Sequence, residues 1–507
     1  MPIAAEAAID ALLREGITHV FSGPGAAVPP LLGVLGERPL VRGVSARHEH
    51  VAAFMADGFA RASGELAACA ATRGPAAASL TRALHAAYAE SVPVLAIVGE
   101  VDDPLAPRDD VDPVALFAPV TKWAFEIRAA EQLPGLVQRA AQVAVTGRPR
   151  PVMVSVPLAV QSRALAEPDF RLPFSVTAGV PAAGEIARAA EMLAWSTRPA
   201  IVVGGGAERQ AARTTVAALA DALGAPVVCA WQRKSAFPND HPAFVGMLGP
   251  GGHGVAEHAV SDADVVLTLG CQLARRGWIP VSADAALLQV DIDPEELGRA
   301  VAPTVALCGD AEATARELLE TLGDPLEHSE ARWQRRLGLR SSYEEQTRLP
   351  DDAGLGTELV RALVHAQQAA DPIFVVESSA LGALLQRHLP VTRAASYYGG
   401  GGAPGWGFGA ALGAQLARPV ERVLCVSGAD GFWMVAQDLE TAVRERIGVV
   451  TVAVGHEGVP DLAALARLAG AHGERVERPD GLAPAIDRAL AADGPAVVHV
   501  AHDVEQP

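Results

Sequence analysis

One carboxylate stands where it could take part in acid–base chemistry. Glu49 lies in the stretch SARHEHVAAFMADGFARASG, residues 45–64. The apolar spacing from Val51 to Ala62 predicts a helix, so Glu49 falls just before its first turn or inside it. An acid at this position gains from the helix dipole, and that stabilising role alone would explain it. A role in proton transfer needs support from neighbouring residues.

Two glycine-rich turns could hold a ligand through main-chain groups. The stretch VSGADGFW, residues 426–433, lies where a predicted strand ends and a helix begins, which is typical of turns that bind phosphate. The stretch YYGGGGAPGWGFGAALGA, residues 397–414, lets the backbone approach a ligand closely, because glycine has no side chain. Its glycines would equally suit close packing of a helix on a sheet.

Two further features indicate ligands more weakly. The stretch VVGGGAERQ, residues 202–210, follows a strand and opens a helix, as a dinucleotide site does. Its spacing is not G-x-G-x-x-G, so the cluster is a weak signal. Arg73, in the stretch TRGP, could bind a substrate carboxylate with both arms of its guanidinium group, or could make only a surface salt bridge.

The elements that must position these residues form three α/β blocks. Apolar runs of strand length alternate with helical patterns, which is typical of βαβ units around a parallel sheet. We expect three doubly wound domains, at residues 1–160, 181–325 and 350–507. A proline-broken linker and a charged, mostly helical connector separate them. The strand-like runs are ITHVFSGPG, LAACAATRGP, VPVLAIVG, RPVMVSVP, RPAIVVGGG, APVVCAW, ADVVLTLG, LLQVDIDP, VALCGDAEA, DPIFVVES, RVLCVSGADG, GVVTVAVG and PAVVHV.

Composition argues against several kinds of partner. The formal net charge of −18 over 507 residues leaves no basic stripe for nucleic acid and disfavours anionic membranes. No run approaches the roughly 18 apolar residues of a membrane span, and the acidic first helix is unlike a signal peptide. We therefore expect a cytoplasmic protein that binds a small molecule. Five cysteines are expected to be reduced core residues: Cys69, Cys229, Cys271, Cys308 and Cys425.

Nearly the whole chain resembles the thiamine diphosphate (ThDP)-dependent enzymes of the acetolactate synthase and benzoylformate decarboxylase type. Several matching stretches share spacing as well as residue types. They are GITHVFSGPGAAVPPLL, RHEHVAAFMADGFARASG, TRGPAAASLTRALHAAYAESVPVLAIVGEV, PVTKWAFEI, RPRPVMVSVP, FPNDHPAFVGMLGPGG, VDIDPEELGR and DLETAVRER. The resemblance implies a pyrimidine-binding N-terminal domain, a central Rossmann-like domain and a diphosphate-binding C-terminal domain.

In this family the acid matching Glu49 hydrogen-bonds the pyrimidine ring of ThDP and promotes removal of the thiazolium C2 proton. The cofactor lies between the first domain of one subunit and the third domain of another, so the resemblance implies a homodimer or homotetramer. His50 and Arg73 are then substrate candidates, although each of His48, His50, His85 and His456 could be purely structural. The positions that the resemblance places around the cofactor are Gly25, Gly402, Pro404, Gly428, Asp430 and His456.

The chain departs from the family at the magnesium anchor. The family holds the metal by a Gly-Asp-Gly turn and an Asn-Asn pair, whereas here Ala429 replaces the aspartate and Gly455-His456 replaces the pair. A long segment that covers the diphosphate in relatives is also missing after His456. Alanine and glycine offer no side-chain oxygen, so we expect no magnesium bound in the family's manner.

An alternative pair of residues could still form a metal site. Asp430 and Glu457 have the same separation as Ala429 and His456, so a one-residue slip could supply two carboxylates. In the alternative, Asp430 points to solvent or caps the helix expected to begin near Gln437. Pro404 stands where relatives carry a bulky residue under the bent cofactor, which weakens the match at the glycine-rich stretch.

The sequence leaves several functions open. The first is decarboxylation or carboligation of a 2-oxo acid or related carbonyl compound with ThDP. The second is other chemistry on a different ligand, catalysed by a diverged member without the metal anchor, and the third is a non-catalytic partner subunit. Some relatives bind FAD in the central domain and others leave it empty, so FAD stays possible here.

Overall fold

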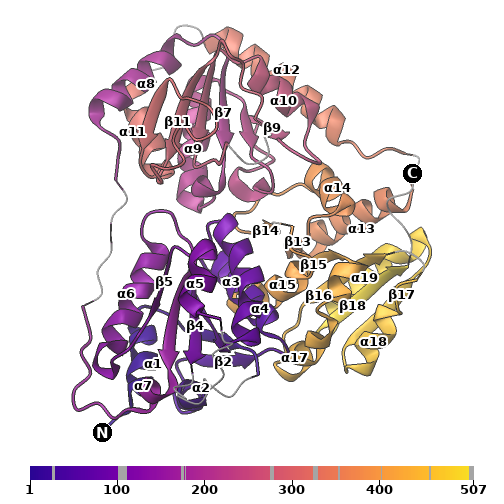
Figure 1. Cartoon of the computed structure of the whole chain (residues 1–507). Helices are drawn as coiled ribbons and strands as arrows, with labels where there is room; N and C mark the ends of the chain where they lie inside the picture. Colours follow the sequence, from indigo (N-terminus) through magenta and orange to yellow (C-terminus); the bar gives the residue numbers. More distant parts are fainter. Residues whose placement is uncertain are drawn as a thin grey trace. The chain divides into compact units, whose positions relative to one another are not determined.

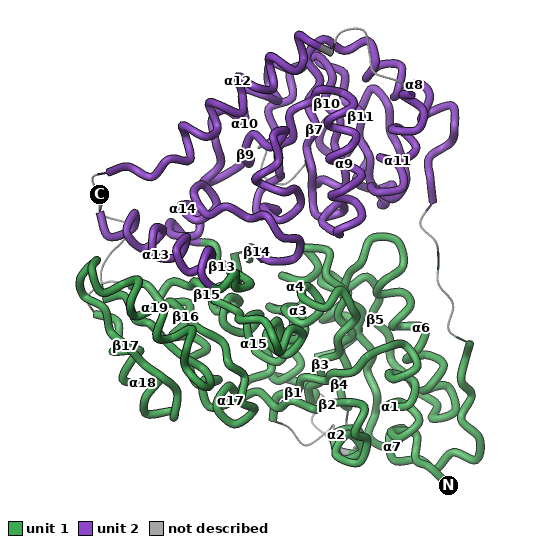
Figure 2. The backbone as a smooth tube through the Cα atoms, turned by 180° about the vertical axis from the view of Figure 1, so that it is seen from behind, with its two compact units in different colours: residues 1–176, 370–378, 400–503 green, residues 177–369, 379–399, 504–507 purple. Residues whose placement is uncertain are grey.

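The computed structural model describes residues 1–24, 29–100, 111–172, 176, 179–273, 279–323, 329–351, 354–400, 402–455 and 458–501. The chain forms two compact units (Figure 2). Unit 1 consists of residues 1–176, 370–378 and 400–503, and unit 2 of residues 177–369, 379–399 and 504–507. Within the described ranges, no helix combines the length and apolar character that a bilayer span requires.

The first domain is a parallel sheet of six strands in the order β2-β1-β3-β4-β6-β5. Strand β4 reads VLAIVGE and is buried along most of its length, as expected for a parallel strand covered on both faces. The strands are β1 (His19–Ser22), β2 (Arg42–Ser45), β3 (Ala67–Thr72), β4 (Val94–Glu100), β5 (Trp123–Glu126) and β6 (Val152–Pro157). The helices are α1 (Ala4–Arg14), α2 (Pro29–Leu35), α3 (Glu49–Ser63), α4 (Pro75–Ala89), α5 (Pro113–Phe117), α6 (Leu133–Val145) and α7 (Leu158–Ser162).

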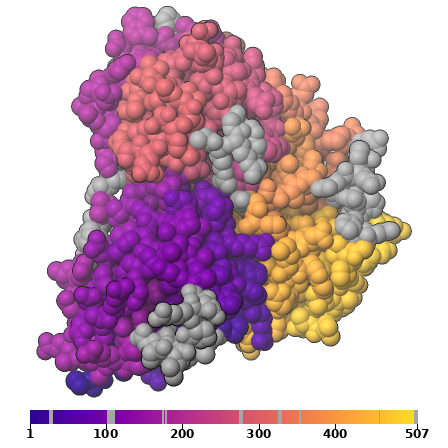
Figure 3. All heavy atoms as spheres, in the orientation of Figure 1, coloured from indigo at the N-terminus to yellow at the C-terminus, as the bar shows by residue number. Residues whose placement is uncertain are grey.

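The central domain is a second parallel sheet, in the order β12-β11-β10-β7-β8-β9, flanked by helices (Figure 1). Figure 3 shows the outer atoms of this domain in pink and red. The strands are β7 (Pro199–Val203), β8 (Val227–Cys229), β9 (Phe244–Met247), β10 (Val265–Leu269), β11 (Ala286–Asp291) and β12 (Val305–Cys308). The helices are α8 (Ala183–Trp195), α9 (Gln210–Leu223), α10 (Gly254–Ser261), α11 (Ala311–Leu322) and α12 (Ser329–Thr347).

The third sheet has the strand order β14-β13-β15-β16-β18-β17. Three α/β domains with six-stranded parallel sheets confirm the expected fold class. The strands are β13 (Ile373–Val376), β14 (Tyr397–Gly399), β15 (Val423–Gly428), β16 (Val450–Gly455), β17 (His472–Val476) and β18 (Ala496–Ala501). The helices are α13 (Leu355–Ala370), α14 (Ala380–His388), α15 (Trp406–Ala417), α16 (Ala429–Trp433), α17 (Leu439–Arg444), α18 (Leu462–Leu468) and α19 (Leu482–Ala491).

The cysteine expectation needs one correction. All five cysteines are free thiols, and Cys69, Cys229, Cys271 and Cys425 are buried as expected. Cys308 is exposed. It ends β12, which lies at the edge of the central sheet and alternates buried with exposed residues.

Within unit 1, helices α3 and α15 pack at backbone distance. A Cβ added to Gly58 would lie 1.9 Å from the carbonyl oxygen of Ala410, and one added to Gly413 would lie 1.9 Å from that of Met55. No other residue fits at either position without moving a helix. The crossing is also pinned by Asp57, which is fully buried and pairs with Arg61 at 2.7 Å. Asp57 accepts a hydrogen bond from the indole of Trp406 at 2.5 Å.

The helix crossing generates the first prediction. Gly58→Ala should destabilise the protein by about 2–3 kcal/mol, because its methyl group meets main-chain atoms that cannot yield cheaply. Gly338→Ala is the matched control, since Gly338 lies in the middle of α12 and a Cβ added there would have nothing within 4 Å. That variant should be unchanged or stabilised by up to about 1 kcal/mol. Urea unfolding checks both, and equal stabilities of the two variants would contradict the packing described.

Candidate active site

Glu49 lies at the point of the first sheet where the strand order reverses. Strand β1 has β2 on one side and β3 on the other, and ligands of such sheets bind at the carboxyl ends of the strands beside this reversal. Glu49 opens α3 and is only 8% exposed. A Cβ added to Gly23, which follows β1, would lie 2.5 Å from Cγ of Glu49. The missing side chain at Gly23 therefore makes room for this carboxylate at the strand ends.

Two histidines flank the carboxylate. His48 caps the start of α3, and its Nδ1 lies 3.3 Å from Oε2 of Glu49. The Nδ1 atoms of His48 and His50 are 2.8 Å apart. Burial lowers the pKa of His50 to about 4, with further contributions from His48 and Arg82, so this imidazole is neutral at pH 7. Whether His50 contacts a substrate stays a prediction.

A second carboxylate, which the sequence reasoning missed, occupies the equivalent point of the third sheet. Glu377 follows β13, the strand at which the order of this sheet reverses, and is 6% exposed. It accepts hydrogen bonds from the N–H of Gly405 and the hydroxyl of Ser427. A Cβ on Gly431 would lie 2.5 Å from its Oε2. Burial raises the pKa of Glu377. An acid directly after the apolar run PIFVV was the signal that could have identified it.

The two residues that the resemblance places at the metal position are packed against each other. Ala429 follows β15 and Gly455 ends the neighbouring strand β16. Ala429 is 1% exposed, and a Cβ added to Gly455 would lie 2.3 Å from the Cβ of Ala429. The two backbones thus approach more closely than any side chain at residue 455 allows. Neither residue supplies a side-chain oxygen, so this turn does not fit a magnesium ion held in the family's manner.

The other predicted residues divide between strand ends and exposed turns. Arg73 follows β3 at the same sheet edge as Glu49 and is half-buried. Gly402 has φ +81°, which favours glycine, and the carbonyl of Pro404 accepts a hydrogen bond from Arg82. Gly428 ends β15 with open space where a side chain would be. The remaining predicted positions Gly25, His456 and Glu457 lie outside the described residues.

Asp430 matches the alternative of an exposed residue and not that of a helix cap near Gln437. It lies in the first turn of α16 and is exposed. It does not cap a helix near Gln437, because a 3-10 turn, η5 (Ala436–Asp438), precedes α17 there. Whether Asp430 could share a cation with Glu457 lies outside what the described residues test.

Close packing explains the glycine cluster of the central domain. A Cβ on Gly204 would lie 2.1 Å from the carbonyl oxygen of Gly270, and one on Gly206 would lie 2.8 Å from the Cα of Gly270. The side chain of Arg233 covers Gly205, with its Nε 3.1 Å from the Cβ position. These glycines are needed for the approach of two loops. They therefore give no support to FAD.

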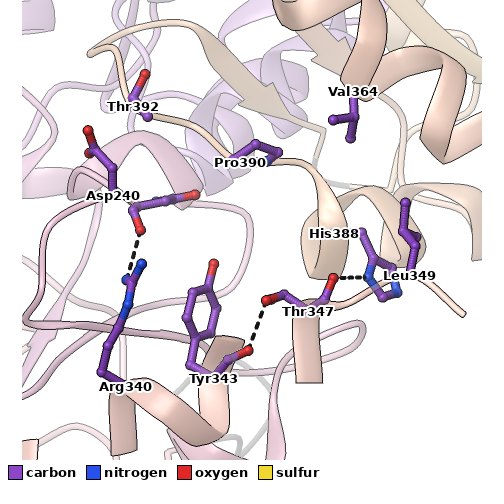
Figure 4. A pocket seen from close by; sticks show the side chains of 10 residues that line it. Asp240, Arg340, Tyr343, Thr347, Leu349, Val364, His388, Pro390 and Thr392 are labelled. Carbon is purple, nitrogen blue, oxygen red and sulfur yellow. Dashed lines mark hydrogen bonds between the residues drawn. The ribbon is translucent and has the colours of Figure 1, made fainter. Parts of the chain in front are cut away.

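Unit 2 also has an open pocket of about 410 Å³ (Figure 4). Arg340 lines it but donates to the carbonyl of Asn239 at 3.0 Å and to Glu344 at 2.7 Å. The ring of His388 is bonded to the carbonyl of Thr347 at 3.0 Å. These polar groups are thus engaged in holding local structure, and none of the predicted site residues lines the pocket.

A third buried acid lies near the histidines in unit 1. Asp438, in η5, is fully buried. Its Oδ1 accepts the main-chain N–H of Arg47 at 2.7 Å and the hydroxyl of Thr441 at 2.9 Å. Its Oδ2 is buried and has no hydrogen-bond partner among the described residues. Burial raises the pKa of Asp438 from 3.8 to about 6, against the opposing effects of these hydrogen bonds and of His48.

Asp438 makes stability depend on pH. A raised pKa favours the protonated acid in the folded state, so this contribution is present below pH 3.8 and is lost as the pH rises through about 6. Asp438→Asn keeps the acceptor and cannot ionise. Relative to the wild type, it should gain on the order of 3 kcal/mol between pH 4 and pH 7.5.

Urea unfolding at both pH values checks this difference. Asp493→Asn, which changes an exposed acid, should give no such gain and serves as the control. A pH-independent difference between Asp438→Asn and the wild type would show that Asp438 is ionised across this range.

Comparison with known proteins matches all three domains to one family. The N-terminal TPP-binding domain of thiamine pyrophosphate enzymes matches residues 3–116, and their central domain matches residues 186–318. Their C-terminal TPP-binding domain matches residues 380–458 and 454–500. The order of the matched domains agrees with the order of the three sheets.

Full-length relatives agree with these domain matches. The chain is 31% identical to a probable acetolactate synthase large subunit of Methanocaldococcus jannaschii over 98% of this chain and 92% of the relative. It is 32% identical to the acetolactate synthase isozyme 2 large subunit of Escherichia coli K12, over 98% and 94%. The solved ThDP-dependent 4-hydroxybenzoylformate decarboxylase of Rhodococcus jostii RHA1 has the same fold, with a TM-score of 0.86 over the whole of both chains at 24% identity. The chain belongs to the thiamine diphosphate-dependent enzyme family, of the acetolactate synthase type.

Proposed function

We propose that this protein is an acetolactate synthase-like enzyme that decarboxylates or carboligates a 2-oxo acid or related carbonyl compound. The observation that carries the proposal is the buried Glu49 carboxylate, at the strand-order reversal of the first sheet and inside the match to the N-terminal TPP-binding domain. Relatives that bear the name acetolactate synthase cover nearly the whole chain. These relatives support a 2-oxo acid or related carbonyl compound as the substrate class.

The first domain fits the pyrimidine half of ThDP. A buried carboxylate can share a proton with a ring nitrogen, and the absent side chain of Gly23 leaves space for the Glu49 side chain to turn over the strand ends. When bound, ThDP would supply a nucleophilic carbon and accept the electrons left by decarboxylation. Glu49 would hold and move the proton, and His50 and Arg73 are the residues proposed to contact substrate.

The third domain does not fit the magnesium ion that holds the diphosphate half of ThDP in the family. Ala429 and Gly455 fill the family's magnesium position with a methyl group and a bare backbone. The proposal therefore includes no metal. A diphosphate would be held by main-chain N–H groups of the turns at Gly402 and Gly428. As in the family, these turns would be supplied by another copy of the chain, so we propose a homodimer or homotetramer.

The packing of Ala429 against Gly455 also favours two alternative functions. A diverged enzyme without the metal–diphosphate anchor would use Glu49 on a different ligand, and a non-catalytic partner subunit would not use it at all. The Ala429–Gly455 contact favours both alternatives, because packed apolar atoms stand where the family has its magnesium ligands. Substitution of Glu49 distinguishes these functions, because it should lower the activity of an enzyme and leave a non-catalytic partner subunit unaffected.

Glu49→Gln should lower turnover of a 2-oxo acid by about 100-fold or more while leaving the fold intact, because only proton transfer is lost. Carbon dioxide release and product formation from pyruvate and benzoylformate, with ThDP present, measure it. Glu65→Gln is the matched control, since Glu65 is exposed just beyond the other end of α3. Equal activity of the two variants would show that Glu49 takes no part in the reaction.

Restoring ligand oxygens should strengthen cofactor binding. Ala429→Asp combined with His456→Asn is expected to bind ThDP about tenfold more tightly than the wild type in the presence of magnesium, because an ion can then bridge protein and diphosphate. Gly455 is left unchanged, since any side chain there meets residue 429. Titration calorimetry measures the change, with His456→Asn alone as the control. If the double variant binds ThDP no more tightly than the wild type, the missing side-chain oxygens at residues 429 and 456 are not what weakens binding.

A further inference from the structure

Three polar contacts converge on one nitrogen at the start of α3. Nδ1 of His48 lies 2.8 Å from Nδ1 of His50, 3.3 Å from Oε2 of Glu49 and 3.5 Å from the main-chain nitrogen of His50. A neutral imidazole carries one proton, so each ring nitrogen either donates or accepts. The two rings cannot both present lone pairs at 2.8 Å. One proton must therefore lie between them.

The carboxylate decides which ring carries that proton. If it were on Nδ1 of His50, the lone pair of His48 would face the oxygen of an ionised Glu49. With the proton on Nδ1 of His48, this N–H can donate to Nδ1 of His50 at 2.8 Å, and the same nitrogen lies 3.3 Å from the oxygen of Glu49. This tautomer gives up the main-chain contact at 3.5 Å, which is at the limit of a hydrogen bond, and it places the proton of His50 on its buried Nε2, which has no hydrogen-bond partner among the described residues.

The surroundings keep His50 neutral and leave His48 open to solvent. The guanidinium group of Arg82, on α4, and the ring of His48 disfavour a charge on His50, which is also largely buried. His48 faces Asp438 of η5 and the neighbouring Arg47 and Glu49. Its side chain is 44% exposed, compared with 11% for Glu49. Water thus reaches the His48 ring more readily than it reaches the carboxylate.

We propose that His48, held in its Nδ1–H form by the lone pair of His50, passes protons between solvent and Glu49. Water delivers a proton to Nε2 of His48, forming an N–H bond there. The Nδ1–H bond then breaks, its electron pair stays on the ring, and an O–H bond forms on Oε2 of Glu49. The reverse sequence returns the proton to water. His50 is a positioning residue in this scheme, and the inference rests on the proposed role of Glu49 in proton transfer.

The test is the tautomer of His48, observed by nitrogen NMR in protein labelled with ¹⁵N-histidine, without cofactor or substrate. The wild type should show His48 protonated on Nδ1, and His48→Gln identifies its signals. His50→Phe removes the lone pair and should cause loss of the Nδ1–H form. His50→Asn can return an acceptor oxygen to the same place and should restore it. His85→Phe, an exposed change on α4, should leave the tautomer unaltered.

A wild-type His48 protonated on Nε2 would overturn the inference, as would an Nδ1–H form that survives in His50→Phe. The wild-type spectrum alone decides the matter if His50→Phe fails to fold. Because no turnover is measured, an inactive enzyme would refute the proposed function without changing this result. A correct tautomer together with full activity of Glu49→Gln would refute the proposed function and the proton relay that rests on it, and would leave only the tautomer assignment standing.

Discussion

The candidate site depends on how closely α3 and α15 approach each other. Helix α3 begins with the His48–Glu49–His50 group, and α15 begins directly after the glycine-rich turn at Gly402. Because Gly58 and Gly413 bring main-chain atoms into contact, neither helix can slide without separating the first and third domains of unit 1. The buried Asp57, bonded to Arg61 and Trp406, adds a directional constraint that apolar packing alone lacks. The geometry around Glu49 follows from this crossing.

Three of the buried acids in unit 1, Glu377, Asp438 and Glu49, differ in what already satisfies them. Glu377 accepts hydrogen bonds from the start of α15 and from Ser427, so its role is to hold the glycine-rich turn against the third sheet. Asp438 ties the chain before α3 to η5 and is uncharged at low pH. Glu49 meets only His48 among the described polar side chains, and the contact is long for a strong hydrogen bond. Of the three, Glu49 has the most bonding capacity left for a ligand.

The strands inside each sheet were predictable from the sequence. Every strand that the apolar runs failed to identify lies at the edge of a sheet: β2, β5, β9, β14 and β17. Of these, β17 reads HGERV and is mostly polar, whereas β9 and β14 are buried but only four and three residues long. Glu49 was predictable because its helix pattern and the family motif coincide. Glu377 and Asp438 were missed because their burial depends on residues distant in sequence, and the Ala429–Gly455 contact depends on the register of β15 and β16.

The central claim is that the acid of the first domain is retained while the metal position of the third is filled by packed backbone and a methyl group. The most direct measurement is calorimetric titration of the unaltered protein with ThDP, once with magnesium and once with a chelator. The account predicts weak binding that magnesium changes little. Tight binding that disappears with the chelator would contradict it and would require oxygen ligands that Ala429 and Gly455 do not supply.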